Sequence, residues 1–217
     1  MKKTVLIKLG LFCLGLLIVR VVTSANWSFV FMFWNLFLAW LPYYFIRLYP
    51  KTKSKLKQVC FLLLSLLFLP NAPYIITDLF HLHQSPVAPL WLDLLLILSF
   101  AMLGLSYFIL SVKEILLIAA EFISNKTSYF FVKLSIMLLS AYGIYLGRFL
   151  RFNSWDVLTD PLNLIDRIFH SLCDNSQIKE TLSITLSFAI FLFLIYELYE
   201  SLRYETSDPK KLFEKTT

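Results

Sequence analysis

The sequence predicts an all-α fold: an integral membrane helical bundle of about six transmembrane helices, with short interfacial helices on its outer face. Hydrophobic residues make up 59% of the 217-residue chain and charged residues only 16%, whereas soluble domains average about 45–50% and about 25%. The apolar residues gather in segments long enough for a helix to cross a bilayer, which takes about 20 residues. The basic residues are distributed unevenly among the connections between these segments.

Each transmembrane helix is predicted from one apolar segment, and together they form a single transmembrane domain over residues 1–217 with a short cytoplasmic tail at 203–217. The segments cover residues 4–23, 28–48, 56–70, 91–112, 132–150 and 181–199. The third segment is short for a full crossing. The chain has no internal repeat or low-complexity tract, so we expect no separate soluble domain.

The basic residues predict the orientation of the bundle. If the segments alternate across the membrane, 15 of the 20 basic residues fall on the side of the N-terminus. The other side holds Arg20, Arg148, Arg151, Arg167 and Lys179. This asymmetry predicts that both termini are cytoplasmic in a multi-pass protein of the cell membrane, inner or plasma. The net charge of +6 then reflects topology and attraction to anionic lipid, so the expected partner is the lipid bilayer and not nucleic acid.

The first segment resembles a secretory signal, with a basic start, an apolar centre and small residues near Ala25. Arg20 lies close behind the apolar run and favours an uncleaved anchor. The three cysteines, Cys13, Cys60 and Cys173, fall at different depths or on different sides of the predicted bundle. We therefore expect no intramolecular disulfide.

The stretch Leu69–Pro89 places polar chemistry between two apolar runs. A short helix capped by Asn71 is predicted here, and at about 11 residues, or ~16 Å, it is too short to span and should be interfacial or re-entrant. Spacings of three and four put Tyr74, Asp78 and His81 on one stripe. Ionisable groups near hydrocarbon depth are costly, so this stripe is a candidate functional site.

Three roles remain open for Asp78 and His81. They can act as a catalytic acid/base pair, as two metal ligands, or as a structural hydrogen bond that closes a loop onto the bundle. The chain has no HExxH or CxxC motif, so no metal is specified by spacing. A metal site would need His81 or His83 to meet more distant ligands, namely His170, Asp93 or Cys173.

A second polar cluster follows the fifth segment. Gly143 and Gly147 form a small-xxx-small pair that lets a neighbouring helix approach closely. Arg148 and Arg151 are predicted one turn apart on a shared helical face, where they can bind a carboxylate or phosphate or simply reach lipid head groups. The residues predicted to contact a substrate are Asn71, Tyr74, Asp93, Arg148, Arg151, Asn153 and Asp156.

A third element is predicted between the fifth and sixth segments. Asp160 and Pro161 favour a helix start, and apolar residues at helical spacing follow opposite a polar face. This pattern is typical of an amphipathic helix that lies in the membrane interface. It can act as a lid over the two polar clusters.

Two phrases carry a family resemblance. They are LFLPNAPYIITDLFHL (67–82) and YGIYLGRFLRFNSWDV (142–157), and the WLD at 91–93 adds a third feature. The phrases resemble the signature segments of a bacterial membrane-protein family known as domain of unknown function 1361. The resemblance implies a multi-pass membrane protein and no particular activity.

Several function classes fit these observations. One is an enzyme at the outer leaflet that acts on a lipid-linked or phosphate-bearing substrate, with Asp78 and His81 moving protons and the arginines holding an anionic lipid or lipid-linked ligand. Another is a transporter, flippase or assembly factor that uses the same cluster as a binding vestibule, and a third is a purely structural membrane protein. Ionisable residues are scarce in the middle of the segments, which disfavours a transporter. No nucleophile motif occurs, which disfavours an enzyme.

Overall fold

The computed structural model describes residues 3–82, 88–174 and 176–207, and this part of the chain is all helical, as predicted. The elements, in order, are α1 (Lys3–Ser24), α2 (Phe31–Leu48), η1 (Tyr49–Lys51), α3 (Lys55–Phe68), α4 (Asn71–Tyr74), η2 (Ile75–His81), α5 (Leu90–Ala120), α6 (Lys126–Arg148), α7 (Asp156–Thr159), α8 (Pro161–Cys173) and α9 (Ile178–Ser207). The two η elements are 3₁₀ helices.

Five helical stretches in the described residues are long and apolar enough to cross a membrane. They are Lys3–Ser24, Lys55–His81, Leu90–Ala120, Lys126–Arg148 and Ile178–Tyr204. The second predicted segment forms α2 but is not among these five. Its composition explains the difference, because Asn35, Pro42 and several Trp and Tyr side chains dilute the aliphatic residues of this 18-residue helix.

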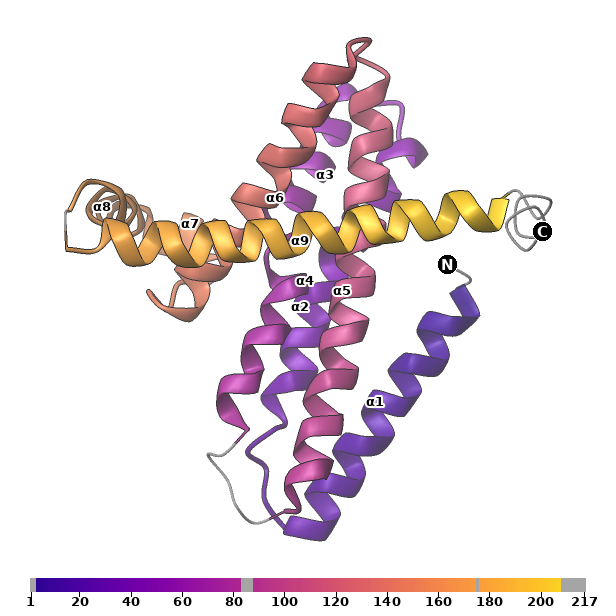
Figure 1. Ribbon diagram of the computed structural model, residues 1–217, viewed down its shortest axis with the longest axis vertical. Helices are drawn as coiled ribbons and strands as arrows, with labels where there is room; N and C mark the ends of the chain where they lie inside the picture. The colour runs from indigo at the N-terminus through magenta and orange to yellow at the C-terminus, as the bar shows by residue number, and fades with distance from the viewer. Residues whose placement is uncertain (1–2, 83–87, 175, 208–217) are drawn as a thin grey trace, which may run out of the picture.

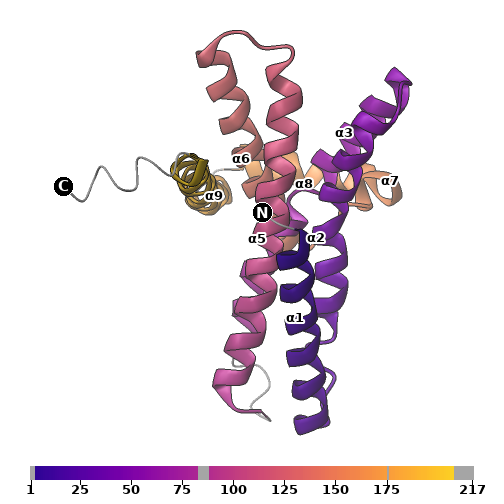
Figure 2. The same ribbon diagram turned by 90° about the vertical axis from the view of Figure 1, so that its right-hand side faces the viewer.

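The longest helix, α5, is the centre of the arrangement. It packs against α1 and α2 over one half of its length and against α6 over the other (Figures 1 and 2). Figure 1 shows α9 lying across the other long helices, and Figure 2 shows it nearly end-on beside α6. The sixth predicted segment is thus helical but is not aligned with the others.

An ion-pair cluster holds α9 against α6. Lys133 Nζ of α6 binds Glu197 and also lies 3.1 Å from Glu200 Oε2, both on α9. The same ammonium group lies 5.3 Å from the ring centroid of Phe193 and 5.7 Å from that of Tyr196. Ammonium groups are attracted to aromatic faces, so one lysine organises the crossing of the two helices.

The helical stretch Lys55–His81, which contains the third predicted segment, is broken in the middle. Helix α3 ends at Phe68, and after Leu69 and Pro70 the chain continues through α4 and the 3₁₀ helix η2 to His81. The prediction of a separate interfacial or re-entrant helix from Asn71 is therefore wrong, because this segment continues the third span. Asn71 does not cap it either, since its side chain donates to the Phe68 carbonyl at 3.0 Å.

Glycines on two neighbouring helices accommodate the broken segment. A Cβ atom on Gly104 of α5 would lie 2.4 Å from the carbonyl oxygen of Ala72, and one on Gly143 of α6 would lie 2.4 Å from Cγ of Pro70. On Gly147 a Cβ atom would meet the Tyr74 ring at 3.1 Å. The close approach predicted for Gly143 and Gly147 is confirmed, and the neighbour is the broken span.

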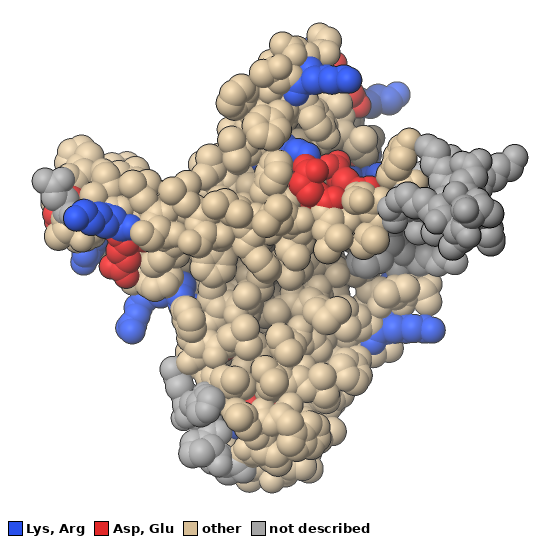
Figure 3. All heavy atoms as spheres, in the orientation of Figure 1, with Lys and Arg blue, Asp and Glu red and all other residues tan. Residues whose placement is uncertain are grey.

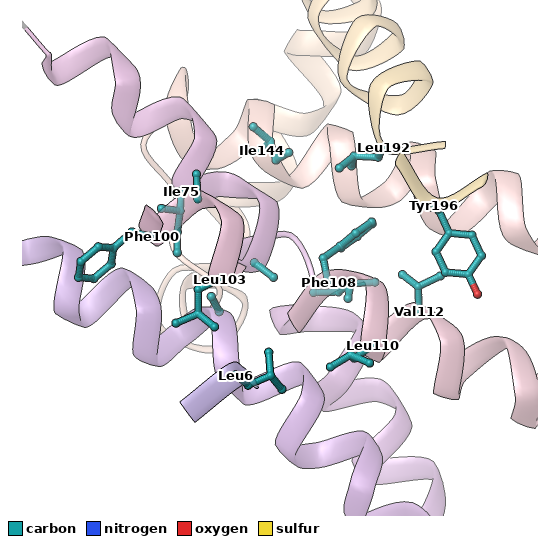
Figure 4. Packing of buried hydrophobic residues seen from close by; sticks show 14 of the residues in the cluster. Leu6, Ile75, Phe100, Leu103, Phe108, Leu110, Val112, Ile144, Leu192 and Tyr196 are labelled. Carbon is teal, nitrogen blue, oxygen red and sulfur yellow. The ribbon is translucent and has the colours of Figure 1, made fainter. Parts of the chain in front are cut away.

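The core is formed mainly by α5 and the elements that surround it. Phe100, Leu103 and Phe108 of α5 are at most 1% exposed, and they lie among residues of η2, α6 and α9 such as Ile75, Ile144 and Leu192 (Figure 4). The outer surface is also largely apolar. Figure 3 shows broad areas without a charged side chain, as expected where helices face lipid.

Candidate functional site

A cavity of about 450 Å³ lies beside the break in the third span. Small-molecule sites usually have volumes of about 300–1,000 Å³. Helices α2, α3, α4, α6, α7 and α8 all contribute to its wall, which consists mostly of apolar residues. Its polar lining residues are uncharged: Asn35, Asn71, Tyr74, Tyr142, Asn153 and Ser154.

Arg148, the last residue of α6, is bound by three side chains of η2. Its Nε donates to Thr77 Oγ1 at 2.7 Å, its Nη2 donates to Asp78 Oδ1 at 2.5 Å, and its Nη1 lies 3.0 Å from Nε2 of His81. The guanidinium carbon lies 4.6 Å from the centroid of the Tyr74 ring. Arg148 thus combines hydrogen bonds from its N–H groups with a cation–π contact to Tyr74.

Asp78 is enclosed within this cluster. The residue is 1% exposed, and its second carboxylate oxygen accepts a hydrogen bond from Asn35 Nδ2 of α2 at 3.0 Å. Asp78 and His81 share a face because residues three apart align in a 3₁₀ helix. Their shared partner is Arg148, so the three charged or titratable groups form one assembly.

Two residues connect the cluster with the cavity. Tyr74 lines the cavity and also stacks on Arg148. Asn35 lines the cavity and donates to Asp78. The cluster therefore supports one side of the cavity wall, while neither Asp78 nor Arg148 lines the cavity itself.

Asp93 lies in a different ion pair. Its Oδ1 is 2.5 Å from Nε of Arg20, and the two side chains are 2% and 0% exposed. Arg20 also donates to Ser24 and lies over the Phe29 ring, 5.1 Å from its centroid. This buried pair joins α1 to α5 and does not line the cavity.

Arg151 does not share a helical face with Arg148. Helix α6 ends at Arg148, whereas the prediction extended it to residue 150, and Arg151 is exposed in a left-handed backbone conformation with φ of 62°. The backbone N–H of Phe152 returns to the Leu146 carbonyl at 3.0 Å, which closes the end of the helix. The prediction of paired arginines is wrong because the chain turns between them.

The remaining predicted residues form the turn after α6. Asp156 Oδ2 accepts the backbone N–H of Asn153 at 2.6 Å, which shapes the start of α7. Asn71 Nδ2 donates to Ser154 Oγ at 2.8 Å and so ties this turn to the broken span. Among the predicted substrate-binding residues, Asn71, Tyr74 and Asn153 are brought together around the cavity.

Metal ligation finds little geometric support among the described residues. No group of three or more His, Cys, Asp and Glu side chains that could hold a metal ion occurs among them. His81 meets Arg148, and His170 pairs with Asp166 of α8 at 3.5 Å. His83 lies outside the described residues.

Sequence reasoning missed Asn35, Thr77 and Ser154. Asn35 carried a usable signal, because it is the one amide in α2, whose other residues are apolar or aromatic apart from Arg47 near its end. Thr77 and Ser154 carried none, since single hydroxyl residues are common in membrane helices and loops. Only their positions beside Arg148 and Asn71 give them a role.

The fold and the site define a helical protein with several helices apolar enough to cross a membrane and a cavity with amide and hydroxyl groups in its wall. Residues 34–195 match the family described as protein of unknown function (DUF1361), and the chain belongs to that family. No curated protein and no solved structure matches the chain.

Proposed function

We propose that this protein binds an amphipathic small molecule, a lipid or a lipid-linked compound with an uncharged hydrogen-bonding head group, in the cavity beside the broken third span. The observation that carries the proposal is the chemistry of the cavity wall. Apolar side chains make up most of it, and its polar groups are amides and hydroxyls. Such a wall suits an apolar tail and a neutral polar head.

The cluster of Arg148, Asp78 and His81 beside the cavity favours a binding protein over an acid/base catalyst. Both carboxylate oxygens of Asp78 are engaged, by Arg148 and by Asn35. A general base must reach the proton that it removes, and a 1% exposed carboxylate with two partners is poorly suited to that role. The neutral lining also favours a neutral head group over the anionic one expected from paired arginines.

A transport or flippase vestibule is the second candidate, and the broken helix favours it. Seven residues, Ile75–His81, form a 3₁₀ helix that follows the break and the short helix α4. Runs of 3₁₀ helix longer than three or four residues are uncommon and often mark a functional hinge. Discontinuous helices beside a binding site are typical of secondary transporters.

The test compares lipid occupancy of two matched variants by native mass spectrometry after mild detergent extraction. Val157 of α7 lines the cavity, whereas its neighbour Leu158 does not line it and is 83% exposed. We expect Val157→Trp to fill the cavity and lower occupancy by about tenfold, as a loss of roughly 1.4 kcal/mol would. Leu158→Trp should retain wild-type occupancy.

Two outcomes would count against the proposal. Equal occupancy in wild type, Val157→Trp and Leu158→Trp would mean that co-purifying lipid lies elsewhere on the surface. A wild-type protein that carries no amphipathic molecule, and gains none when incubated with phosphatidylcholine vesicles that contain diacylglycerol, would mean that the cavity is a packing defect.

A further inference from the structure

Helix α8 directs its apolar side chains toward two different surroundings. Leu164 and Ile168 line the cavity, and Ser171 nearby is fully buried with its hydroxyl 2.8 Å from that of Tyr142 on α6. Leu162, Ile165 and Phe169 point elsewhere. These three side chains are 80%, 62% and 62% exposed, so most of their surface is not covered by the protein.

The polar residues of α8 form a third face. Asn163, Asp166, Arg167 and His170 are all exposed, and Asp166 pairs with His170 one turn on. The exposed apolar stripe of Leu162, Ile165 and Phe169 therefore lies between the cavity face and the polar face. A helix with this division suits a boundary between an apolar phase and water.

The rest of the cavity wall, outside α8, also contains apolar side chains that are exposed at the protein surface. Leu139 of α6, Trp34 of α2 and Val157 of α7 line the cavity and are 66%, 51% and 42% exposed. The Trp34 ring lies 6.3 Å from that of Trp155, and tryptophans favour the membrane interface. The cavity is thus bordered by apolar side chains that reach the outer surface of the protein.

We infer that the exposed stripe of α8 lies in membrane lipid and that the cavity opens sideways to lipid between α8 and the wall formed by Trp34 and Leu139. Leu164 and Ile168 of α8 share the cavity wall with the exposed Leu139 of α6, a helix apolar enough to cross a membrane, and this shared wall favours lipid over a protein partner. Helix α8 is then the lid of a lateral portal. This inference rests on the proposed function and adds the route by which the ligand arrives.

The location of the stripe is tested with single nitroxide labels. The background carries Cys13→Ala, Cys60→Ser and Cys173→Ser, and labels are placed by Ile165→Cys, Phe169→Cys and, as the control on the same helix, Asp166→Cys. Protein is reconstituted in phosphatidylcholine and phosphatidylglycerol vesicles, and collision with oxygen and with a water-soluble nickel chelate is measured. We expect labels at 165 and 169 to collide mainly with oxygen and the label at 166 mainly with nickel.

Two patterns of collision would overturn the lipid assignment. Equal nickel access at all three positions would place the stripe in water. Shielding of the labels at 165 and 169 from both reagents would identify a protein partner instead.

The portal is tested by measuring diacylglycerol occupancy after delipidated protein is incubated with phosphatidylcholine vesicles that contain diacylglycerol. Phe169→Asp puts a charge into the stripe and should lower the initial rate of lipid uptake by about tenfold, whereas Phe169→Leu should retain the wild-type rate. An unchanged rate in Phe169→Asp would overturn the portal and leave the proposed function intact. If the labels at 165 and 169 lie in lipid but the cavity of the wild-type protein takes up no lipid, the proposed function is wrong, and the portal is wrong with it.

Discussion

Arg148 and Asp78 are 70 residues apart in the sequence and form an ion pair of 2.5 Å, which joins the end of α6 to the broken third span. The Asp78 side chain is 1% exposed and also binds Asn35. Arg148 has Thr77 and His81 as further partners. Because Arg148 also contacts Tyr74, the ion pair holds in place the part of the cavity wall that Tyr74 forms. The geometry therefore assigns these residues first to the stability of the broken segment.

The first prediction follows from this burial. Arg148→Ala should lower the free energy of unfolding by about 3–5 kcal/mol, because it leaves a buried carboxylate without its counter-charge. The measurement is thermal or denaturant unfolding in detergent. A double variant, Arg148→Met with Asp78→Leu, should be less destabilised than Arg148→Ala alone, since it removes both charges. Wild-type stability in Arg148→Ala would show that the cluster is not a structural support.

The second prediction concerns the contact between α5 and the break. Gly104→Ala should destabilise the protein by about 1–3 kcal/mol, because its Cβ would meet a backbone oxygen that cannot rotate away. Gly15→Ala on α1 is the matched control, since no atom lies within 4 Å of a Cβ there. It should be neutral or slightly stabilising. Similar unfolding midpoints for the two variants would contradict the close packing of the break.

The third prediction separates two roles for Arg151. Its left-handed backbone costs about 1–2 kcal/mol for a residue with a Cβ, and glycine avoids that cost. Arg151→Gly should therefore leave stability unchanged or raise it by up to about 1 kcal/mol, with lipid occupancy as in wild type. A clear loss of occupancy in Arg151→Gly, together with normal folding, would restore Arg151 as a ligand-binding residue.

The fourth prediction concerns the orientation of the chain. Cys60 and Cys173 are exposed and Cys13 is buried, so only the first two can report on sidedness. If both termini are cytoplasmic, a membrane-impermeant maleimide should label Cys173 but not Cys60 in intact cells, and both after permeabilisation. Labelling of Cys60 in intact cells would show that the chain has the opposite orientation.

Helix positions were largely predictable, and the errors have physical causes. The first segment was predicted at 4–23, and α1 covers Lys3–Ser24. The fourth was predicted to end at residue 112, yet α5 continues to Ala120, because Lys113 and Glu114 interrupt hydropathy without interrupting a helix. The amphipathic helix expected after Asp160 is confirmed as α8, although Asp160 makes no cap hydrogen bond to its backbone.

The broken span could not be derived from hydropathy or periodicity. The third apolar segment was predicted to end at residue 70, and a separate short interfacial or re-entrant helix was the interpretation of the residues from Asn71 onward. The alternative, a helical continuation through the break, is accommodated because α5 and α6 present Gly104 and Gly143 opposite Ala72 and Pro70. That match depends on how the helices are aligned, which one sequence does not specify.

The sequence by itself determined the class of the protein, the positions of most helices, the close approach at Gly143 and Gly147, and a polar segment around Asp78. The tertiary structure decided which charged groups meet. Arg20 pairs with Asp93, Arg148 with Asp78, and Lys133 with Glu197 and Glu200, across separations of 73, 70, 64 and 67 residues. Helical periodicity specifies the face on which a residue lies, whereas its partner depends on the rotation and height of a neighbouring helix, and these are set by the packing of the whole bundle.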